Sequence, residues 1–474
     1  MNKISKLVSV LLVALLLSFM FFGSSREILS PEPVTESTSW LGRTGNITVW
    51  YTDERLSAYI TKAAVEFGEM ENITVIPVLK PLENFLDSAY EASVAGESFP
   101  DLVITGSETL EKAYLSGLAT EIDDNEMQIG PLNFSDAAVN AVMYHGKKLG
   151  YPLCFDTSVL VYNRTYLEQW ASQMAIADLT GNTLDMGGGD SESDDMEVTG
   201  ISEEDIDPAE LEALTSEYIQ KMVPYTMEDL MTIANSYSVP QGVEGIISWD
   251  MSSIMYNYWI VGSAITVGGP TGDDRTVISV NNDTAAECLE KYQNLHDYFS
   301  IDSSKVTYDS VVQDFIDGKT VFTIGGYDMV NRLAEATADG SLVYEYGFSE
   351  MPNVTSEIPS SSLSVTSVVC VNDYSVKKEL AGSFALFLAR DEAGTFNELT
   401  GLASASRSFG WEGGANQIYA MEYAGSVTLP KMMETENFWM QLETMFARIW
   451  EGGDVREELT TLEDSMKTVL GASA

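Results

Sequence analysis

The first part of the chain alternates short apolar runs with stretches of helical spacing. Residues 47–51 read Ile-Thr-Val-Trp-Tyr and predict a strand, and residues 72–78 predict a second strand. Between these runs, one helical face is apolar and carries Leu56, Tyr59, Ile60, Ala63, Ala64 and Phe67. Strand, helix and strand in this order predict parallel pairing with a right-handed crossover. The pattern therefore indicates an α/β protein.

The residues after the first strand are candidates for a binding site. In open parallel sheets, ligands bind beyond the carboxyl ends of the strands. Tyr51, Asp53 and Glu54 stand at that end of the predicted strand 47–51. A second helix over 82–95, ended by Gly96, leads to another apolar run over 101–105, which predicts the next strand end.

Two apolar runs over 151–162 are separated by Asp156 and Thr157. Pro152 cannot donate a hydrogen bond to a sheet, and it favours an extended backbone at Tyr151. We therefore expect a connector that leaves one sheet and enters another. A core strand has no need of a carboxylate, so the spacing leaves Asp156 open as a solvated loop residue or as a functional one.

Residues 315–327, FIDGKTVFTIGGY, predict the end of a helix, a strand and a glycine pair. The sequence Gly318-Lys319-Thr320 is similar to the end of a phosphate-binding loop, but Gln313 stands where that motif has glycine. Nucleotide binding is therefore not expected. Gly325-Gly326 should leave backbone N–H groups and the Tyr327 ring at the carboxyl end of the strand.

An acidic insertion is expected over 172–222. Between Ala171 and Thr215 there are thirteen Asp or Glu and no Lys or Arg. The segment from Asp190 does not fit a calcium loop, because Asp195 occupies the sixth position and Ile201 the twelfth. We expect a mobile, dispensable loop over 178–205, followed by a short helix over 207–222.

The N-terminal residues 1–26 resemble an export segment. Lys3 and Lys6 precede an uncharged run over 7–23, which is slightly short for a spanning helix, so a cleaved signal peptide and a membrane anchor both stay open. No cysteine occurs before Cys154, which argues against a lipid anchor. Residues 27–45 have no periodicity and predict a linker.

The composition excludes several classes of partner and of catalytic site. The chain has 72 acidic and 25 basic residues and a formal charge of −47, which excludes nucleic acid and anionic lipid as partners. Its three cysteines form no paired motif, so no metal, redox centre or other cofactor is expected. His145 and His296 lie in no HExxH motif, and no GxSxG motif occurs.

Several motifs resemble one family. The segment 145–163, HGKKLGYPLCFDTSVLVYN, is similar to the first crossing between lobes in the type 1 extracellular solute-binding proteins of ABC transporters, which include maltose-binding protein. Residues 100–106 with 115–123, residues 315–327 and residues 346–352 also resemble family segments. The resemblance covers about residues 46–470, apart from the insertion.

The resemblance implies two Rossmann-like lobes joined by hinge crossings, the periplasmic-binding-protein type II fold. Residues 46–156 with 359–404 would form lobe 1, and residues 157–358 with 405–474 would form lobe 2, with the acidic insertion inside lobe 2. Asp156 would then line the cleft between the lobes. Thr105 and Glu108 stand where maltose-binding protein has a tryptophan and an acidic residue. Tyr256, Tyr327 and Trp439 match positions of aromatic residues that stack on sugar.

The implied function is that of an extracytoplasmic receptor, which captures a small solute between closing lobes and delivers it to ABC permease subunits. A carbohydrate is the first expectation. The acidic candidates also suit a cationic solute, such as an amine or basic peptide, and a sensor without transport stays open. Asp53, Glu54, Glu108 and Asp156 leave a glycoside hydrolase as a remote alternative. We expect an exported monomer, membrane-tethered or released.

Overall fold

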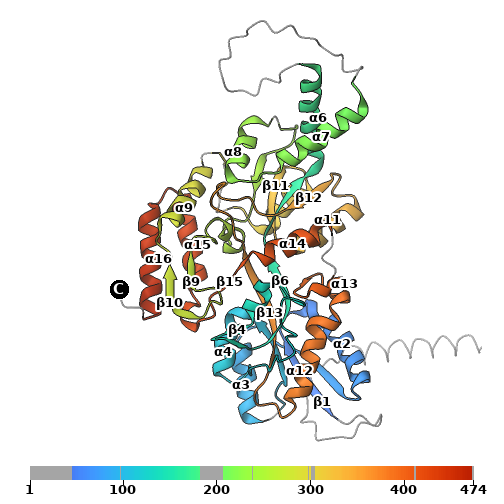
Figure 1. The fold of residues 1–474 in the computed structure, drawn as a ribbon, viewed down its shortest axis with the longest axis vertical. Coiled ribbons are helices and arrows are strands. Elements are labelled where there is room, and N and C mark those ends of the chain that lie inside the picture. The colour runs from blue at the N-terminus through green and yellow to red at the C-terminus, as the bar shows by residue number, and fades with distance from the viewer. Residues whose placement is uncertain are drawn as a thin grey trace, which may run out of the picture.

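The computed structural model describes residues 45–96, 98–181, 206–237, 239–296, 298–299, 301, 305–409 and 413–471. These residues form two main sheets, each covered by helices (Figure 1), and two small two-stranded sheets. We call the seven-stranded sheet with its helices lobe 1, and the four-stranded sheet with its helices lobe 2. The export segment and most of the linker, which the sequence places before residue 45, lie outside the described residues.

Lobe 1 has the strand order β14-β6-β13-β3-β1-β2, with β15 paired to β13. β1 and β2 are parallel, as the sequence predicted, with Asn46 opposite Thr74. β13 runs antiparallel to both β3 and β6. The strands are β1 (Asn46–Tyr51), β2 (Thr74–Leu79), β3 (Leu102–Gly106), β6 (Tyr151–Thr157), β13 (Leu363–Val371), β14 (Ala403–Ser404) and β15 (Val427–Thr428).

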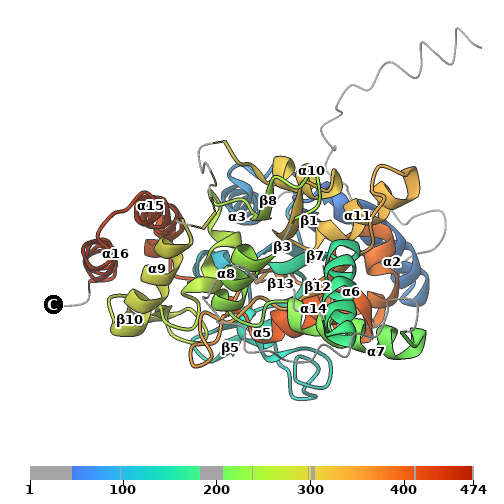
Figure 2. The ribbon, with the colours of Figure 1, turned by 90° about the horizontal axis from the view of Figure 1, so that it is seen from above.

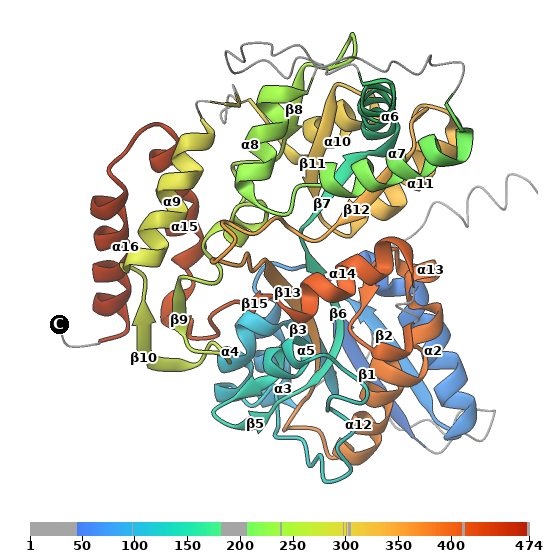
Figure 3. The ribbon, with the colours of Figure 1, turned by 45° about the horizontal axis from the view of Figure 1, so that its top comes forward.

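Helices cover both faces of this sheet. Figure 3 shows α2 and α12 on one side and α3, α4 and α5 on the other. The helices of lobe 1 are α2 (Ser57–Met70), α3 (Phe85–Ala95), α4 (Leu110–Leu115), α5 (Asp136–Ala141), α12 (Lys378–Leu386) and α13 (Phe396–Thr400). Gly96 ends α3 in the left-handed conformation, which glycine adopts without steric cost.

Lobe 2 has the strand order β12-β7-β11-β8. β7 runs antiparallel to β11 and β12, and β11 runs parallel to β8. The strands are β7 (Val159–Asn163), β8 (Gly245–Ser248), β11 (Thr320–Gly325) and β12 (Tyr346–Ser349). Two small hairpins complete the sheets: β4 (Met143–Tyr144) with β5 (Lys147–Lys148), and β9 (Thr266–Gly268) with β10 (Asp274–Ser279).

The remaining helices surround the lobe 2 sheet, and α9, α15 and α16 form a separate group at one side of it (Figure 2). They are α6 (Arg164–Thr180), α7 (Pro208–Met222), α8 (Met227–Ser236), α9 (Asp283–Leu295), α10 (Tyr308–Ile316), α11 (Asp328–Asp339), α14 (Gly414–Ala424), α15 (Phe438–Trp450) and α16 (Val455–Val469). Polar side chains start several of them: Asn163, Thr226 and Asn282 each accept a backbone N–H of the first turn.

The chain passes from lobe 1 to lobe 2 at Ser158, between β6 and β7. Pro152 lies where the register of β6 against β13 shifts, so the missing N–H falls at an irregularity of the ladder. The predicted connector between two sheets is confirmed. Asp156, however, belongs to β6 itself and lies opposite Val365 of β13.

The acidic segment is partly helical. α6 continues to Thr180, so the insertion expected from residue 172 begins inside a helix. The predicted helix over 207–222 is confirmed as α7, which lies beside α6, and the Tyr218 hydroxyl donates to the Asp178 carboxylate. Residues 182–205, where a mobile loop was expected, lie outside the described residues. No helix in the described ranges has the length and apolarity needed to cross a membrane.

Candidate functional site

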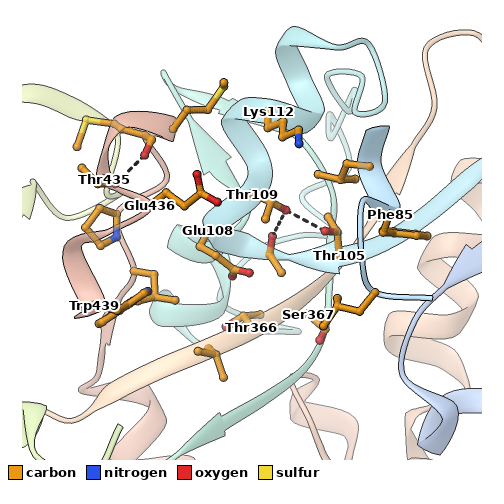
Figure 4. A pocket seen from close by; sticks show the side chains of 18 of the residues that line it. Phe85, Thr105, Glu108, Thr109, Lys112, Thr366, Ser367, Thr435, Glu436 and Trp439 are labelled. Atoms are coloured by element: carbon orange, nitrogen blue, oxygen red, sulfur yellow. Dashed lines mark hydrogen bonds between the residues drawn. The ribbon is translucent and has the colours of Figure 1, made fainter. Parts of the chain in front are cut away.

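A cavity of about 820 Å³ lies between the two lobes. It is bounded in lobe 1 by the end of β3 and the start of α3, and in lobe 2 by the segment that leads into α15 (Figure 4). β13 contributes to it between these walls. The lining residues are Leu82, Asn84, Phe85, Leu86, Asp87, Thr105, Gly106, Glu108, Thr109, Lys112, Val365, Thr366, Ser367, Leu429, Pro430, Met432, Met433, Thr435, Glu436 and Trp439.

The lobe 1 wall carries two hydroxyls that bond to each other. The oxygens of Thr105 and Thr109 are 2.8 Å apart, and Thr109 also donates to the Gly106 carbonyl at 2.8 Å. Thr105 lies near the carboxyl end of β3, and Thr109 follows that end. This is the edge of the sheet at which the sequence analysis placed Thr105 and Glu108 as candidates.

Glu108 lies on the same wall, and its carboxylate folds back over Gly106. A Cβ at Gly106 would lie 2.0 Å from the Glu108 Oε1, so only glycine leaves room for this carboxylate. Burial raises the pKa of Glu108. In the part of the chain that the structure describes, no other residue donates a hydrogen bond to its side chain.

The lobe 2 wall combines an aromatic ring with polar groups. Trp439 is the second residue of α15 and is half-buried. Its ring packs edge to face against that of Tyr258, with 6.4 Å between the ring centroids. Glu436 is exposed just before this helix. Thr435 donates its hydroxyl to the Met432 carbonyl at 2.6 Å. Such a ring can stack on the apolar face of a sugar.

Asp156 ties the crossing to lobe 2. Its carboxylate accepts the backbone N–H of Tyr327 at 2.8 Å and that of Thr157 at 2.9 Å. Burial raises the pKa of Asp156 to about 6. Asp156 is therefore not the solvated loop residue that the spacing had left open, because it lies in β6 and its carboxylate fixes the backbone at the end of β11.

The ring of Tyr327 lies in the interior and is 1% exposed. Its hydroxyl donates to Asn416 at 2.7 Å and accepts from Asn397 at 3.1 Å, and its ring meets that of Tyr419 edge to face. The expectation that this ring is presented at the sheet edge is therefore wrong. The N–H of Tyr327 bonds to Asp156, while the hydroxyl of its buried ring bonds to the amide side chains of Asn416 and Asn397.

Tyr256 is half-buried and stacks on Tyr308, with 4.8 Å between ring centroids. Tyr308 donates to Asp328 at 2.5 Å and accepts the N–H of Gly326 at 3.2 Å. Sequence reasoning missed Tyr308 and Asp328, because their contacts join segments that are distant along the chain. Trp259, three residues after Tyr256, is buried in the core.

The residues after β1 are engaged locally. Asp53 accepts two hydrogen bonds from the Arg55 guanidinium and one from the Arg55 backbone. Although burial opposes it, this arginine holds the pKa of Asp53 below its usual value. The Tyr51 hydroxyl donates to Ser57 at 3.1 Å, and Glu54 is exposed.

The cavity therefore brings together three predicted residues, Thr105, Glu108 and Trp439. The others do not line it: Tyr51, Asp53, Glu54, Asp156, Tyr256 and Tyr327. Sequence reasoning missed the start of α3, the middle of β13 and residues 429–436. The last segment reads Leu-Pro-Lys-Met-Met-Glu-Thr-Glu and has no hydrophobic periodicity. Only its position just before Trp439 in the sequence could have identified it as part of the cavity.

The described residues contain no group of three His, Cys, Asp or Glu side chains placed to hold a metal ion. Cys154, Cys288 and Cys370 are all buried thiols. The chemistry of the cavity therefore comes from hydroxyls, carboxylates, one ammonium group and apolar side chains.

Three solved structures share this fold. A cyclo/maltodextrin-binding protein complexed with maltotetraose has a TM-score of 0.68 and 17% identity, covering 90% of this chain and 97% of that one. An extracellular solute-binding protein from Staphylococcus aureus with maltose has a TM-score of 0.67 and 16% identity, covering 90% and 98%. The periplasmic maltose-binding protein MalE from Listeria monocytogenes, also with maltose, has a TM-score of 0.66 and 16% identity, covering 91% and 99%.

These likenesses confirm the predicted α/β fold of two lobes joined by hinge crossings, the periplasmic-binding-protein type II fold. No curated protein sequence matches the chain. A family model described as bacterial extracellular solute-binding protein matches residues 62–408, which is most of the chain. The motifs, the two-lobed fold and this match agree, and the chain belongs to the bacterial extracellular solute-binding proteins.

Proposed function

We propose that this protein captures a carbohydrate in the cavity between its lobes and delivers it to an ABC importer. The observation that carries the proposal is the cavity of about 820 Å³, which takes its walls from both lobes and holds Trp439 beside hydroxyls and carboxylates. This volume suits an oligosaccharide of a few residues, since pockets for small ligands span about 300–1,000 Å³. The maltose and maltotetraose complexes of similarly folded proteins support the same class of ligand.

Closure of the lobes supplies the link to transport. A ligand that contacts both walls stabilises the arrangement in which the walls are close together. A permease that recognises this arrangement would receive the loaded protein and reject the empty one. The exported location follows from the family, and the N-terminal segment 1–26 supplies either a signal peptide or a membrane tether in this proposal.

A hydrolytic role is less well supported by the side chains. Asp53 is bonded to Arg55, and Asp156 is bonded to two backbone N–H groups, so neither carboxylate faces a ligand in the cavity. Glycoside hydrolysis needs two carboxyl groups that flank one bond. Glu108 and Glu436 do line the cavity, but the chain belongs to a family of solute-binding proteins, and we therefore favour binding without catalysis.

The proposal is tested by titrating the purified protein with maltose, maltotetraose and other oligosaccharides, using calorimetry and thermal unfolding. A ligand at 100 times its dissociation constant should raise the free energy of unfolding by about 2.7 kcal/mol. Trp439→Ala should weaken binding by about 1 kcal/mol, because it removes the stacking surface.

The matched control is Tyr374→Ala, which removes a partly exposed aromatic ring that does not line the cavity. It should leave affinity unchanged. If no sugar in the panel binds, the proposal fails. If sugar binds equally to wild-type protein and to Trp439→Ala, the site lies elsewhere.

A further inference from the structure

The cavity has more negatively than positively charged side chains in its lining. Lys112 bonds to Asp87, with 2.8 Å between Nζ and the carboxylate, and this pair is neutral as a unit. Glu108 in lobe 1 and Glu436 in lobe 2 have no cationic partner among the residues described. Figure 4 shows both carboxylates reaching into the same space, between the β3 wall and Trp439. The cavity therefore holds two uncompensated negative charges, one from each lobe.

Three of the five hydroxyls that line the cavity, those of Thr105, Thr109 and Thr435, add to this bias. Thr109 has one hydroxyl hydrogen, and it donates that hydrogen to the Gly106 carbonyl. In the contact between Thr109 and Thr105, Thr105 must then be the donor. Thr435 likewise donates its hydroxyl hydrogen to a backbone carbonyl, that of Met432. These three hydroxyls have no hydrogen left for a ligand and present only acceptor lone pairs.

Three other shielded acids of this protein pair with a cation, while Asp156 and Glu422 accept backbone N–H groups. Glu111 pairs with Arg275, Asp124 with Lys148 and Glu392 with Lys62. Glu108 differs, because its half-buried carboxylate lies over Gly106 with no partner. A buried carboxylate without a partner is costly. When the lobes close, a neutral ligand would leave both Glu108 and Glu436 with their charges uncompensated.

We propose that the cavity takes a sugar that carries a protonated amine, with the ammonium group between Glu108 and Glu436 and a sugar ring against Trp439. This inference rests on the proposed carbohydrate function and names the class of sugar. An ammonium group has three donors and no acceptor, which matches the two carboxylates and the acceptor oxygens of Thr105, Thr109 and Thr435. Its charge compensates the carboxylates, whereas an acidic or phosphorylated sugar would be repelled.

The sharpest comparison uses β-1,4-linked oligomers of glucosamine and their N-acetylated counterparts. The two series share the ring and the linkage, but acetylation removes the charge. Isothermal titration at low salt should give at least about tenfold tighter binding of the glucosamine oligomer, since a hydrogen bond to a charged group contributes about 1.5–3 kcal/mol. Binding of the glucosamine oligomer should weaken as salt rises, while binding of a neutral oligomer should change little.

Two variants locate the effect. Glu108→Gln and Glu436→Gln should each weaken binding of the glucosamine oligomer at least about tenfold more than binding of a neutral oligomer. Glu287→Gln removes one negative charge from the exposed face of α9, outside the cavity, and should leave both affinities unchanged. This control separates a local contact from the overall charge of −47.

The outcomes distinguish this inference from the proposed function. Equal affinity for glucosamine and N-acetylated oligomers, or unchanged affinity in both glutamine variants, would overturn the amine proposal while leaving carbohydrate binding in place. Failure of every sugar, charged or neutral, would overturn both. Equal losses in Glu287→Gln and Glu108→Gln would show that only the net charge acts, and the proposed contact would be wrong.

Discussion

The lobes contact each other across two neighbouring regions whose charges are arranged in opposite ways. Glu108 and Glu436 both line the cavity, and neither has a cationic partner among the residues described. Beside it, Glu111 of α4 is 2% exposed and accepts hydrogen bonds from Arg275 at 2.9 Å and from the Met433 backbone at 2.6 Å. We call this second region the clasp. It comprises Glu111, Tyr144, Asp273, Arg275, Lys431, Met433 and Glu434.

The charged groups of the clasp all have partners within it or in the adjacent backbone. Tyr144 donates to Glu111 at 2.8 Å, and Arg275 also reaches Glu434. Lys431 is fully buried and donates to the carbonyls of Asn140 and Met143 in lobe 1. The comparison teaches that the two regions have different roles: paired charges hold the lobes together, and unpaired charges leave a place for a ligand.

The largest effect should come from Glu111→Ala. The substitution removes three hydrogen bonds and leaves Arg275 with only Glu434, so we expect the free energy of unfolding to fall by about 2–3 kcal/mol. Denaturant unfolding measures this loss, with Glu287→Ala as the exposed control. A loss below about 0.5 kcal/mol, the usual range of surface substitutions, would contradict the proposed difference between the clasp and the cavity.

Lys431 should make the clasp sensitive to pH. Burial lowers its pKa to about 7 in the folded protein, although Asp273 opposes this shift. Between pH 7 and the usual lysine range, the unfolded chain binds a proton that the folded protein lacks, so stability rises with pH. Relative to Lys431→Met, wild-type protein should gain about 2 kcal/mol from pH 7 to pH 9. Parallel stability curves for the two proteins would contradict this expectation.

The cavity should respond in the opposite sense. Burial raises the pKa of Glu108, so its charged form destabilises the empty protein at neutral pH. Glu108→Gln should therefore stabilise the unliganded protein by about 0.5–1 kcal/mol at pH 7, as substitutions at functional sites often do. The gain should vanish near pH 4, where the carboxyl is protonated in both states. Chemical unfolding at both pH values tests this, and a destabilised variant would mean that Glu108 has a structural partner.

The smallest effect is expected at the exposed rim. Asp87→Asn breaks a solvent-exposed pair with Lys112, so stability should change by less than about 0.5 kcal/mol. The freed ammonium would then lie beside Glu108 and Glu436 and should weaken binding of an aminated sugar by a few fold. If affinity rises instead, Lys112 does not reach the cavity in solution.

The sequence predicted the framework of the protein well. The spacing of apolar residues located β1, α2 and β2 and their parallel pairing, because burial of one face sets the period of each element. Pro152 and the carboxylate at Asp156 marked the crossing, since neither fits a regular core strand. The strand ends followed from topology, and Thr105 and Glu108 lie at the predicted edge.

The details of the site were decided by the fold alone. Asp156 and Tyr327 are 171 residues apart, yet a hydrogen bond between them fixes the backbone and leaves the Tyr327 ring in the core. The wall at 429–436 and the clasp likewise join segments that are distant along the chain. Local periodicity determines which face of an element is buried. Only tertiary packing determines which charges find a partner, and in this protein that difference separates the clasp from the cavity.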